Sequence, residues 1–270
     1  MLTRLPEDEY HSHHALSSGY ARMLLNQSPK HVRYAIDNRT KSTTSAMQIG
    51  SLFHGMVLGR GVMPSLYPED CYKSDGGLNP KPAAAFRDSM PADKLAVKLS
   101  DMANLIGMAQ SANEALASIG VAINPDNSEQ QIYTDIDGCQ VRAMYDYIPD
   151  DTRLPIIDLK KTQDASPDAV AKSMQKYGYD FQREWYGDIY RNETGHDREF
   201  LFLFVEENPP HAWLFATPDF MTREINAMRC RSAREIWSNC IAKGEWAGYS
   251  RDVMQYTMPA WQVTKSLEGE

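Results

Sequence analysis

Residues 141–148 read VRAMYDYI and residues 156–162 read IIDLKKT. Both are apolar runs of strand length, and the loop between them is short enough for a hairpin. Asp158 and Lys160 are two residues apart in a strand, so their side chains point to the same face. Asp146 lies in the neighbouring strand, and a buried carboxylate needs a partner or a metal. The segment therefore predicts two strands that bring two carboxylates and an ammonium group together.

This set of groups has two interpretations. Two carboxylates can hold Mg²⁺ over a phosphodiester, and a lysine beside them supplies positive charge or handles a proton at an attacking water. The plainer alternative is two strand-end aspartates, one of them paired with Lys160. The D-x-K spacing is common, so the rest of the chain has to decide between a metal-dependent hydrolase and a structural ion pair.

A helix predicted over residues 43–58 (TTSAMQIGSLFHGMVL) carries Gly50 and His54. Positions four apart share one helix face, and the glycine is expected to let another backbone approach closely beside His54. A histidine inside an apolar helix is either a hydrogen-bonded core residue or a ligand. Both interpretations stay open at this point.

Three further polar residues are candidates for the same site. Gln182 and Tyr186 are also four apart in a predicted helix, where a solvated polar face is the alternative. Glu129 precedes the strand predicted at 130–135. It either reaches the site from that neighbouring strand or is an exposed loop carboxylate.

The chain as a whole predicts a mixed central β-sheet flanked by helices, an α/β or α+β fold. A three-stranded meander with a turn at Asp137 and Gly138 follows a helical first part. Residues 59–82 are expected to form a long surface loop or flap, and the tail around Trp246, Tyr249 and Trp261 to be irregular. The predicted helices are 18–27, a stretch from 29, 43–58, 93–119, 166 to a break at 178, 179–192 and 217–242, and the predicted strands are 130–135, 141–148, 155–160, 200–205 and 211–216.

Length and composition bound the number of domains. With 270 residues, 42% of them apolar, the chain can bury one large core, and no Pro/Gly/Ser-rich linker divides it. A single domain over residues 1–270 is expected. Its parts are a mainly helical segment at 1–120, the meander and sheet at 121–216, and a C-terminal helix and tail at 217–270.

Composition also bears on location and partners. No apolar run is long enough for a transmembrane helix, and the polar residues 1–14 do not resemble a signal peptide. The net charge of −8 counts mildly against nucleic-acid binding, although a metal site adds its own acidic residues and neutralises them with cations. The cysteines are scattered without a CxxC pair, which argues against a zinc ribbon and favours reduced cytosolic thiols. They are Cys71, Cys139, Cys230 and Cys240.

Taken in order, the motifs resemble the PD-(D/E)xK nuclease superfamily and, within it, the RecB-like branch. They are GxxxH at Gly50 and His54, the first aspartate at Asp146, DxK at Asp158 and Lys160, and QxxxY at Gln182 and Tyr186. Segments along nearly the whole chain, from EDEYHSHHALSSGYARMLLNQSP to MPAW around Trp261, are similar to RecE-type phage recombination exonucleases. Tyr145 replaces the usual proline before the first aspartate, and residues 60–92 match no recognisable segment.

The resemblance implies a restriction-endonuclease-like core and a 5′-to-3′ exonuclease that resects linear double-stranded DNA. The 3′ overhang would serve a single-strand annealing protein in recombination. The resemblance also implies a ring-like homo-oligomer, a trimer or tetramer as in lambda exonuclease, encoded by a phage or prophage and acting in the bacterial cytoplasm without a membrane partner. The implied cofactor is Mg²⁺ or Mn²⁺, one or two ions per site.

The same resemblance assigns the metal ligands. Asp146 and Asp158 would hold the ion. Further candidate ligands are the backbone carbonyl of Leu159, His54 and Glu129.

The remaining roles follow from the same resemblance. Lys160 would orient or deprotonate the attacking water, or stabilise charge on the phosphate. Gln182 and Tyr186 would hydrogen-bond DNA phosphate or the groups around the metal. The candidate DNA contacts are Arg22, Lys161, Lys172 and Lys176.

Two alternatives remain open. A Cas4-like or RecB-like nuclease with an iron–sulfur cluster shares GxxxH and QxxxY but needs clustered cysteines near the C-terminus, where Cys230 and Cys240 lie ten residues apart. A catalytically idle DNA-binding or scaffold protein is the other alternative, and the intact Asp146, Asp158 and Lys160 argue against it.

Overall fold

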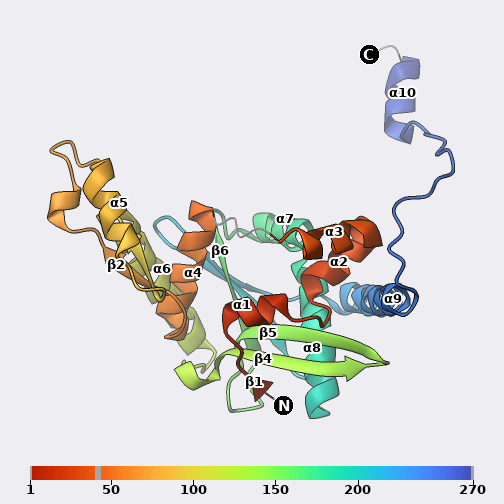
Figure 1. Cartoon of the computed structure of the whole chain (residues 1–270), viewed down its shortest axis with the longest axis horizontal. Coiled ribbons are helices and arrows are strands. Elements are labelled where there is room, and N and C mark those ends of the chain that lie inside the picture. The colour runs from red at the N-terminus through yellow and green to blue at the C-terminus, as the bar shows by residue number, and fades with distance from the viewer. Residues whose placement is uncertain (1, 40–43, 269–270) are drawn as a thin grey trace.

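A mixed β-sheet lies at the centre of the protein (Figure 1). The computed structural model describes residues 2–39 and 44–268. This described part forms a six-stranded sheet in the order β1-β4-β5-β6-β7-β8, in which β6 and β7 are parallel and the other neighbouring pairs antiparallel. The strands are β1 (Leu2–Thr3), β4 (Ser128–Ile136), β5 (Cys139–Tyr147), β6 (Ile156–Thr162), β7 (Phe200–Glu206) and β8 (Trp213–Ala216). The predicted fold class, a mixed sheet flanked by helices, is confirmed.

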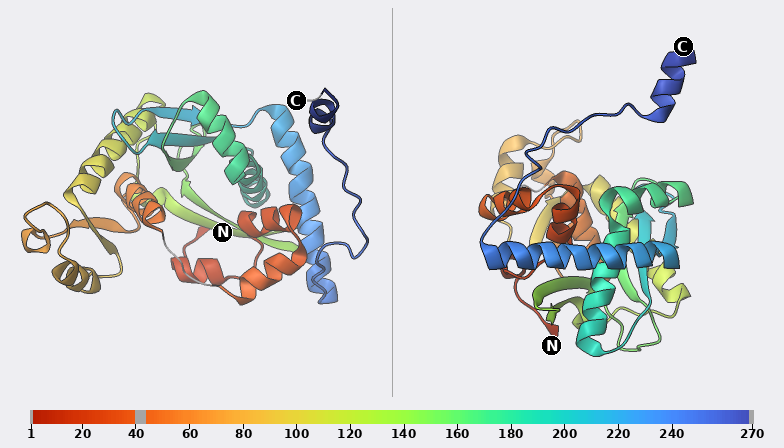
Figure 2. Two further views of the ribbon diagram at one scale, coloured as in Figure 1. Left: turned by 90° about the horizontal axis from the view of Figure 1, so that it is seen from above. Right: turned by 90° about the vertical axis from the view of Figure 1, so that its right-hand side faces the viewer.

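Helices cover both faces of this sheet (Figures 1 and 2). One face packs on α2, α3, α7, α8 and α9, and the other packs on α4 and α6. The strand residues alternate accordingly: Phe202 and Phe204 of β7 face the first core, and Leu203 and Val205 face the second. The helices are α1 (Glu7–Ser12), α2 (Ser18–Asn26), α3 (Pro29–Asp37), α4 (Ser45–Leu58), α6 (Leu99–Ser118), α7 (Pro167–Tyr177), α8 (Tyr179–Thr194) and α9 (Phe220–Lys243).

The meander forms as predicted. Strands β4 and β5 pair through a turn at Asp137 and Gly138, both with positive φ, which short polar residues and glycine tolerate. Strand β6 lies beside β5, and the α7–α8 crossover then returns the chain to β7 in parallel with β6. Gly178 ends α7 in the left-handed conformation, as expected from its position.

The prediction of a long surface loop or flap at residues 59–82 is wrong. Here the chain builds a lobe, defined as residues 63–97, that stands away from the sheet (Figure 1). In the lobe β2 (Met63–Leu66) pairs in parallel with β3 (Lys94–Val97), joined through η1 (Glu69–Cys71) and α5 (Pro80–Asp88). Residues 94–97 were expected to be helical, but pairing with a distant strand overrides their local preference.

The C-terminal part differs in two places. Helix α9 begins at Phe220 rather than at 217, because the Asp219 side chain caps the backbone N–H of Thr222. Trp261 lies in α10 (Ala260–Glu268), at the end of an extended segment, and not in irregular chain (Figure 2). The predicted start of the α4 helix, Thr43, lies outside the described residues. Among the described helices, none is both long and apolar enough to cross a membrane.

Helix α4 makes a close approach at one glycine, but not at the predicted one. A Cβ added at Gly55 would meet the backbone oxygen of Val62 at 2.2 Å, whereas a Cβ added at Gly50 would meet no described atom within 4 Å apart from its chain neighbours and the backbone of its own helix. The expected close approach at Gly50 is therefore wrong, and it occurs at the residue after His54.

We expect Gly55→Ala to lower the free energy of unfolding by about 1–3 kcal/mol, because backbone atoms must move to admit the methyl group. Gly50→Ala is the matched control on the same helix. It should be neutral or stabilising by up to about 1 kcal/mol, since alanine is the better helix former. Chemical denaturation measures both, and equal stabilities of the two variants would contradict the packing at Gly55.

Candidate active site

The site lies where β5 and β6 separate. Among the described residues the two strands share one register pair, Tyr147 with Ile157, whereas β6 stays paired with β7 along its whole length. The backbone of Leu159 therefore reaches side chains on the β5 side instead of a strand. Its N–H donates to Asp146 Oδ2 at 2.7 Å, and its carbonyl lies 3.0 Å from His54 Nε2. A gap between strands, closed by a carboxylate and an imidazole, is the framework of the site.

Asp158 and Lys160 share one face of β6, as predicted. The two side chains form an ion pair, and Gln182 Nε2 donates to Asp158 Oδ2 at 2.7 Å. The Asp158 side chain is 3% exposed. Burial raises the pKa of Asp158 to about 6; the charge of Lys160 opposes this shift and that of Asp146 adds to it. The site thus holds a carboxylate that takes up a proton close to neutral pH.

The ammonium group of Lys160 lies over two aromatic rings. Its Nζ lies 4.7 Å from the ring centre of Tyr179 and 5.6 Å from that of Phe202. Burial lowers the pKa of Lys160, but the carboxylates of Asp158 and Asp146 raise it, and the net shift is upward. The lysine is therefore held as an ammonium ion. Sequence reasoning missed Tyr179, although its place three residues before Gln182 on one helix face was a usable signal.

His54 connects the Leu159 carbonyl to Asp146. Its Nδ1 lies 3.7 Å from Asp146 Oδ2, while Nε2 faces the carbonyl, and 29% of the side chain is exposed. The ring is therefore neither a solvated surface group nor a core residue enclosed on all sides. A proton on Nδ1, directed at Asp146, would leave the Nε2 lone pair available to a ligand.

Glu129 lies at an irregular position of β4. It has a φ of 51° and falls between the register pairs Ser128 with Tyr147 and Gln130 with Tyr145. It lines a cavity of about 450 Å³ together with His54 and Asp146. Its Oε2 is 4.0 Å from Arg60 Nε. The structure thus brings Glu129 to the edge of the site, on the side of Arg60.

Tyr186 lies behind the site. Its ring packs against Tyr145 and Phe200, with centres 5.0 and 6.1 Å away, and its backbone carbonyl accepts a hydrogen bond from the Tyr145 hydroxyl. Burial raises the pKa of its phenol well above the usual value, and the charges of Asp158 and Asp146 add to the shift. It supports the core beneath the two carboxylates.

The four candidate DNA contacts separate into two groups. Arg22 lies beside Gln182 in a second cavity of about 410 Å³, and Lys172 and Lys176 are exposed on α7. Lys161 faces the opposite side of the sheet from Lys160 and pairs with Glu207 at 2.5 Å. The structure therefore does not bring Lys161 together with the other three.

The donor atoms of the site bear on whether it can hold a metal ion. Within residues 2–39 and 44–268, no three His, Cys, Asp or Glu side chains converge into a metal-binding group. However, Asp158 Oδ1 is buried against the Lys160 ammonium group, and no other described residue donates a hydrogen bond to it. The 3.0 Å between His54 Nε2 and the Leu159 oxygen also suits neighbouring ligands of an octahedral ion with bonds of about 2.1 Å. The site offers donor groups of the types that bind such an ion, namely two carboxylates, a carbonyl and an imidazole.

The chain was compared with known proteins. The family described as "PDDEXK-like domain of unknown function (DUF3799)" matches residues 17–255. A crystal structure of a "putative exonuclease" from Eubacterium rectale is similar with a TM-score of 0.59, covering 97% of this chain and 98% of that chain at 12% identity. A "phage related exonuclease" from Haemophilus somnus 129PT aligns with a TM-score of 0.35, over 72% of this chain and 95% of that chain at 14% identity. No curated protein matches.

The first of these structures supports the fold, since at 12% identity the likeness extends no further. The family match covers most of the chain and confirms the predicted PD-(D/E)xK class. This chain therefore belongs to the PDDEXK-like family of unknown function.

Proposed function

We propose that this chain is a metal-dependent nuclease that hydrolyses linear double-stranded DNA from its ends, with Mg²⁺ or Mn²⁺ as cofactor. The observation that carries the proposal is the gap between β5 and β6. There Asp146 and His54 engage the Leu159 backbone, and Asp158 and Lys160 lie on the same strand. A structural ion pair would need neither the second carboxylate nor the imidazole.

Each side chain has a defined task in this proposal. Asp146, Asp158 and the Leu159 carbonyl would hold one or two ions, with His54 as a further ligand. When bound, such an ion polarises the phosphate and lowers the pKa of a coordinated water. Lys160, held as a cation, would stabilise negative charge on the phosphate and orient the attacking water.

Gln182 of α8 and Arg22 of α2 extend the proposed site. Gln182 fixes the Asp158 carboxylate through its hydrogen bond. Arg22, in the cavity beside Gln182, would contact a phosphate of the bound strand. Lys172 and Lys176 on α7 would do so further from the site.

The finer activity rests on the resemblance to RecE-type exonucleases. It comprises 5′-to-3′ resection that leaves a 3′ overhang, a ring-like trimer or tetramer, and a single-strand annealing protein as partner. The Eubacterium rectale protein of similar fold is described as a "putative exonuclease", which supports the exonuclease part of this proposal. Phage or prophage origin belongs to this proposal as well.

A digest of labelled DNA tests the proposal. Linear duplexes labelled at the 5′ or the 3′ end, and a closed circular duplex, are incubated with the protein and Mg²⁺, with EDTA as the control. The expected result is loss of the 5′ label first, a surviving 3′ strand and an intact circle. Cutting of the circle would indicate an endonuclease, and an intact linear substrate would contradict the proposal.

The pKa of Asp158 predicts how the metal requirement changes with pH. Because that pKa is raised to about 6 in the metal-free protein, Asp158 is mostly protonated at pH 5 and ionised at pH 7. A metal must displace this proton, so the Mg²⁺ concentration for half-maximal effect should rise by up to about tenfold per pH unit below 6. Thermal-shift titrations with Mg²⁺ at several pH values measure it, and a constant midpoint from pH 5 to 7 would contradict it.

A further inference from the structure

A third cavity, distinct from those lined by Glu129 and by Arg22, lies across α4 from the active site. It has a volume of about 850 Å³ and opens between the lobe, the first half of α4 and the ends of β6 and β7. The lobe has a small core of its own around Tyr67, Cys71 and Ala83, and it stands apart from the sheet (Figures 1 and 2). The cavity is therefore a cleft between two packed bodies, and no part of the proposed chemistry uses it.

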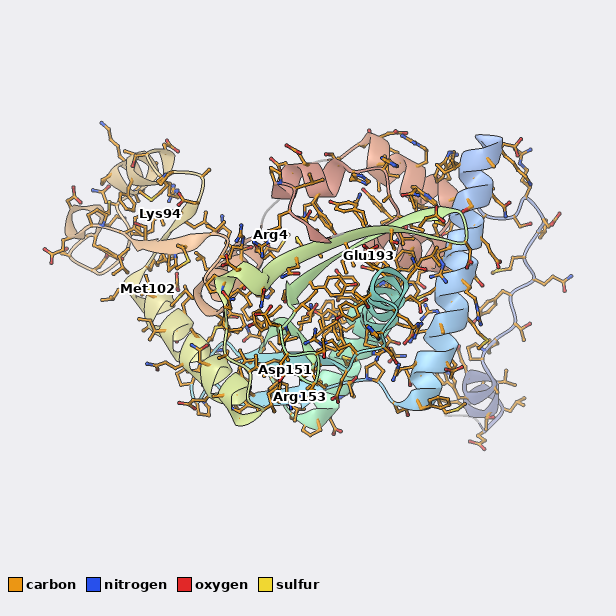
Figure 3. The ribbon with its side chains drawn as sticks, turned by 90° about the horizontal axis from the view of Figure 1, so that it is seen from below. Arg4, Lys94, Met102, Asp151, Arg153 and Glu193 are labelled. Carbon is orange, nitrogen blue, oxygen red and sulfur yellow. The ribbon has the colours of Figure 1, made fainter. Side chains whose placement is uncertain are left out.

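The cleft is basic in a chain that is acidic overall. Arg87, Lys94 and Lys98 line it and are exposed, and Lys94 lies on the lobe (Figure 3). The charge of a fourth cation, Lys161, is neutralised by Glu207, and Asp101 is the other acidic lining residue. The lining thus carries a surplus of positive charge although the net charge of the chain is −8. Such a local surplus favours a polyanion.

The N-termini of two helices add to the positive charge of the cleft. Helix α4 begins at Ser45 and α6 begins at Leu99, directly after Lys98. One N–H at each start already has a partner: that of Met47 donates to Thr44 Oγ1, and that of Leu99 donates to the Tyr72 hydroxyl. Ser45 and Lys98 both line the cleft. Helix N-termini carry partial positive charge and present backbone N–H groups that suit phosphate oxygens.

The floor of the cleft is apolar. It is formed by Ile49, Leu52, Leu95, Val97 and the ring of Tyr67, whose hydroxyl accepts a hydrogen bond from Arg87 at 3.1 Å. Positive charge beside an apolar lining suits a single nucleic-acid strand, because phosphates and bases need different surfaces.

Two elements connect the cleft to the active site. Strand β6 directs Lys160 to the site and Lys161 to the cleft, and α4 directs His54 to the site and Leu52 to the cleft. We propose that the cleft binds the phosphate backbone of single-stranded DNA, namely the strand that is not hydrolysed while its partner enters the site. This inference rests on the proposed nuclease function. Helix α4 then separates the two strands and keeps the surviving one away from Asp158.

Binding without cleavage tests the cleft. The affinity for a fluorescent oligothymidylate is measured by anisotropy in EDTA, over a range of salt concentrations. Arg87→Ala/Lys94→Ala/Lys98→Ala should weaken binding by about tenfold or more at low salt and reduce the salt slope by about two, since each single-strand phosphate contact contributes roughly 0.7. The control, Arg231→Ala/Lys243→Ala/Lys265→Ala, removes the same number of exposed charges from α9 and α10 and should bind as the unchanged protein does.

A variant with the opposite sign completes the test. Asp101→Asn removes an acidic lining residue and should tighten binding severalfold, a gain that misfolding cannot produce. Equal losses in both triple variants, or an unchanged affinity in the cleft variant, would overturn the assignment. The digest separates the two proposals. If the protein cuts DNA and the cleft variant still binds the oligonucleotide normally, the assignment of the cleft is wrong. If the protein does not cut DNA, while the cleft variant loses binding, the proposed nuclease function is wrong.

Discussion

Replacing Asp158 by alanine is expected to reduce Mg²⁺-dependent digestion of linear duplex DNA by roughly a thousandfold or more, the range seen when an essential catalytic group is removed. The reason is geometric. Among the described residues, Asp158 pairs with Lys160 through Oδ1 and accepts a hydrogen bond from Gln182 through Oδ2, so it holds both side chains at the proposed site. Its loss would remove one of the proposed metal ligands and release the lysine from its partner.

The Asp158→Ala protein should still fold. The ammonium group of Lys160 keeps its cation–π contact with Tyr179 and remains close to the negative charge of Asp146. Asp158→Asn is a gentler companion that preserves shape and an acceptor for Gln182. Digestion rates, circular dichroism and thermal melting are measured together. Full activity in a folded Asp158→Ala protein would sink the assignment of the site.

Asp151→Asn provides the matched control. Asp151 lies in the loop that joins β5 to β6, next to Arg153, with which it pairs at the surface (Figure 3). The substitution removes the same charge from the same segment without touching the gap between the strands. Its activity should equal that of the unchanged protein.

The relations within β6 could be predicted from the sequence, because they are local. Alternation along a strand places Asp158 and Lys160 on one face, and the structure shows them in contact. The hairpin at Asp137 and Gly138 and the break at Gly178 follow equally from backbone preferences of single residues. Such features need no knowledge of the distant chain.

Features that depend on distant segments could not be predicted. Residues 94–97 form a strand because they pair with residues 63–66. The alanine and leucine in this segment are also common in helices, so local preference does not predict a strand. The contact at Gly55 depends on where the chain returns at Val62, which the spacing of apolar residues does not encode. In both cases a tertiary partner decides the outcome.

The centre of the site shows the same limit. The resemblance placed His54 and Asp146 in one site as candidate metal ligands, but it did not predict their contacts with the protein backbone. Both engage the backbone of Leu159, because β5 and β6 pair at Tyr147 and then diverge. The contact of Lys160 with the ring of Tyr179 likewise depends on how α8 packs over β6. The motifs identify the residues, and the divergence of two strands turns them into a site.

His54→Ala is expected to lower activity by about 10–100-fold at limiting Mg²⁺, the loss typical when groups that hold or orient a metal are removed. The imidazole is the group that lies between the Leu159 carbonyl and Asp146, at 3.0 and 3.7 Å. Without it the remaining ligands bind the ion more weakly, so part of the activity should return at high Mg²⁺. Initial rates across a Mg²⁺ titration measure both effects.

Ser51→Ala is the control for this experiment. Ser51 precedes His54 by three residues on α4 and lines the same cavity, so its loss perturbs the helix surface without removing a ligand. Its Mg²⁺ midpoint should not change. An unchanged rate of His54→Ala at limiting Mg²⁺ would make His54 a packing residue. A loss that excess Mg²⁺ does not relieve would instead assign it to the positioning of DNA, because only a metal ligand can be compensated by mass action.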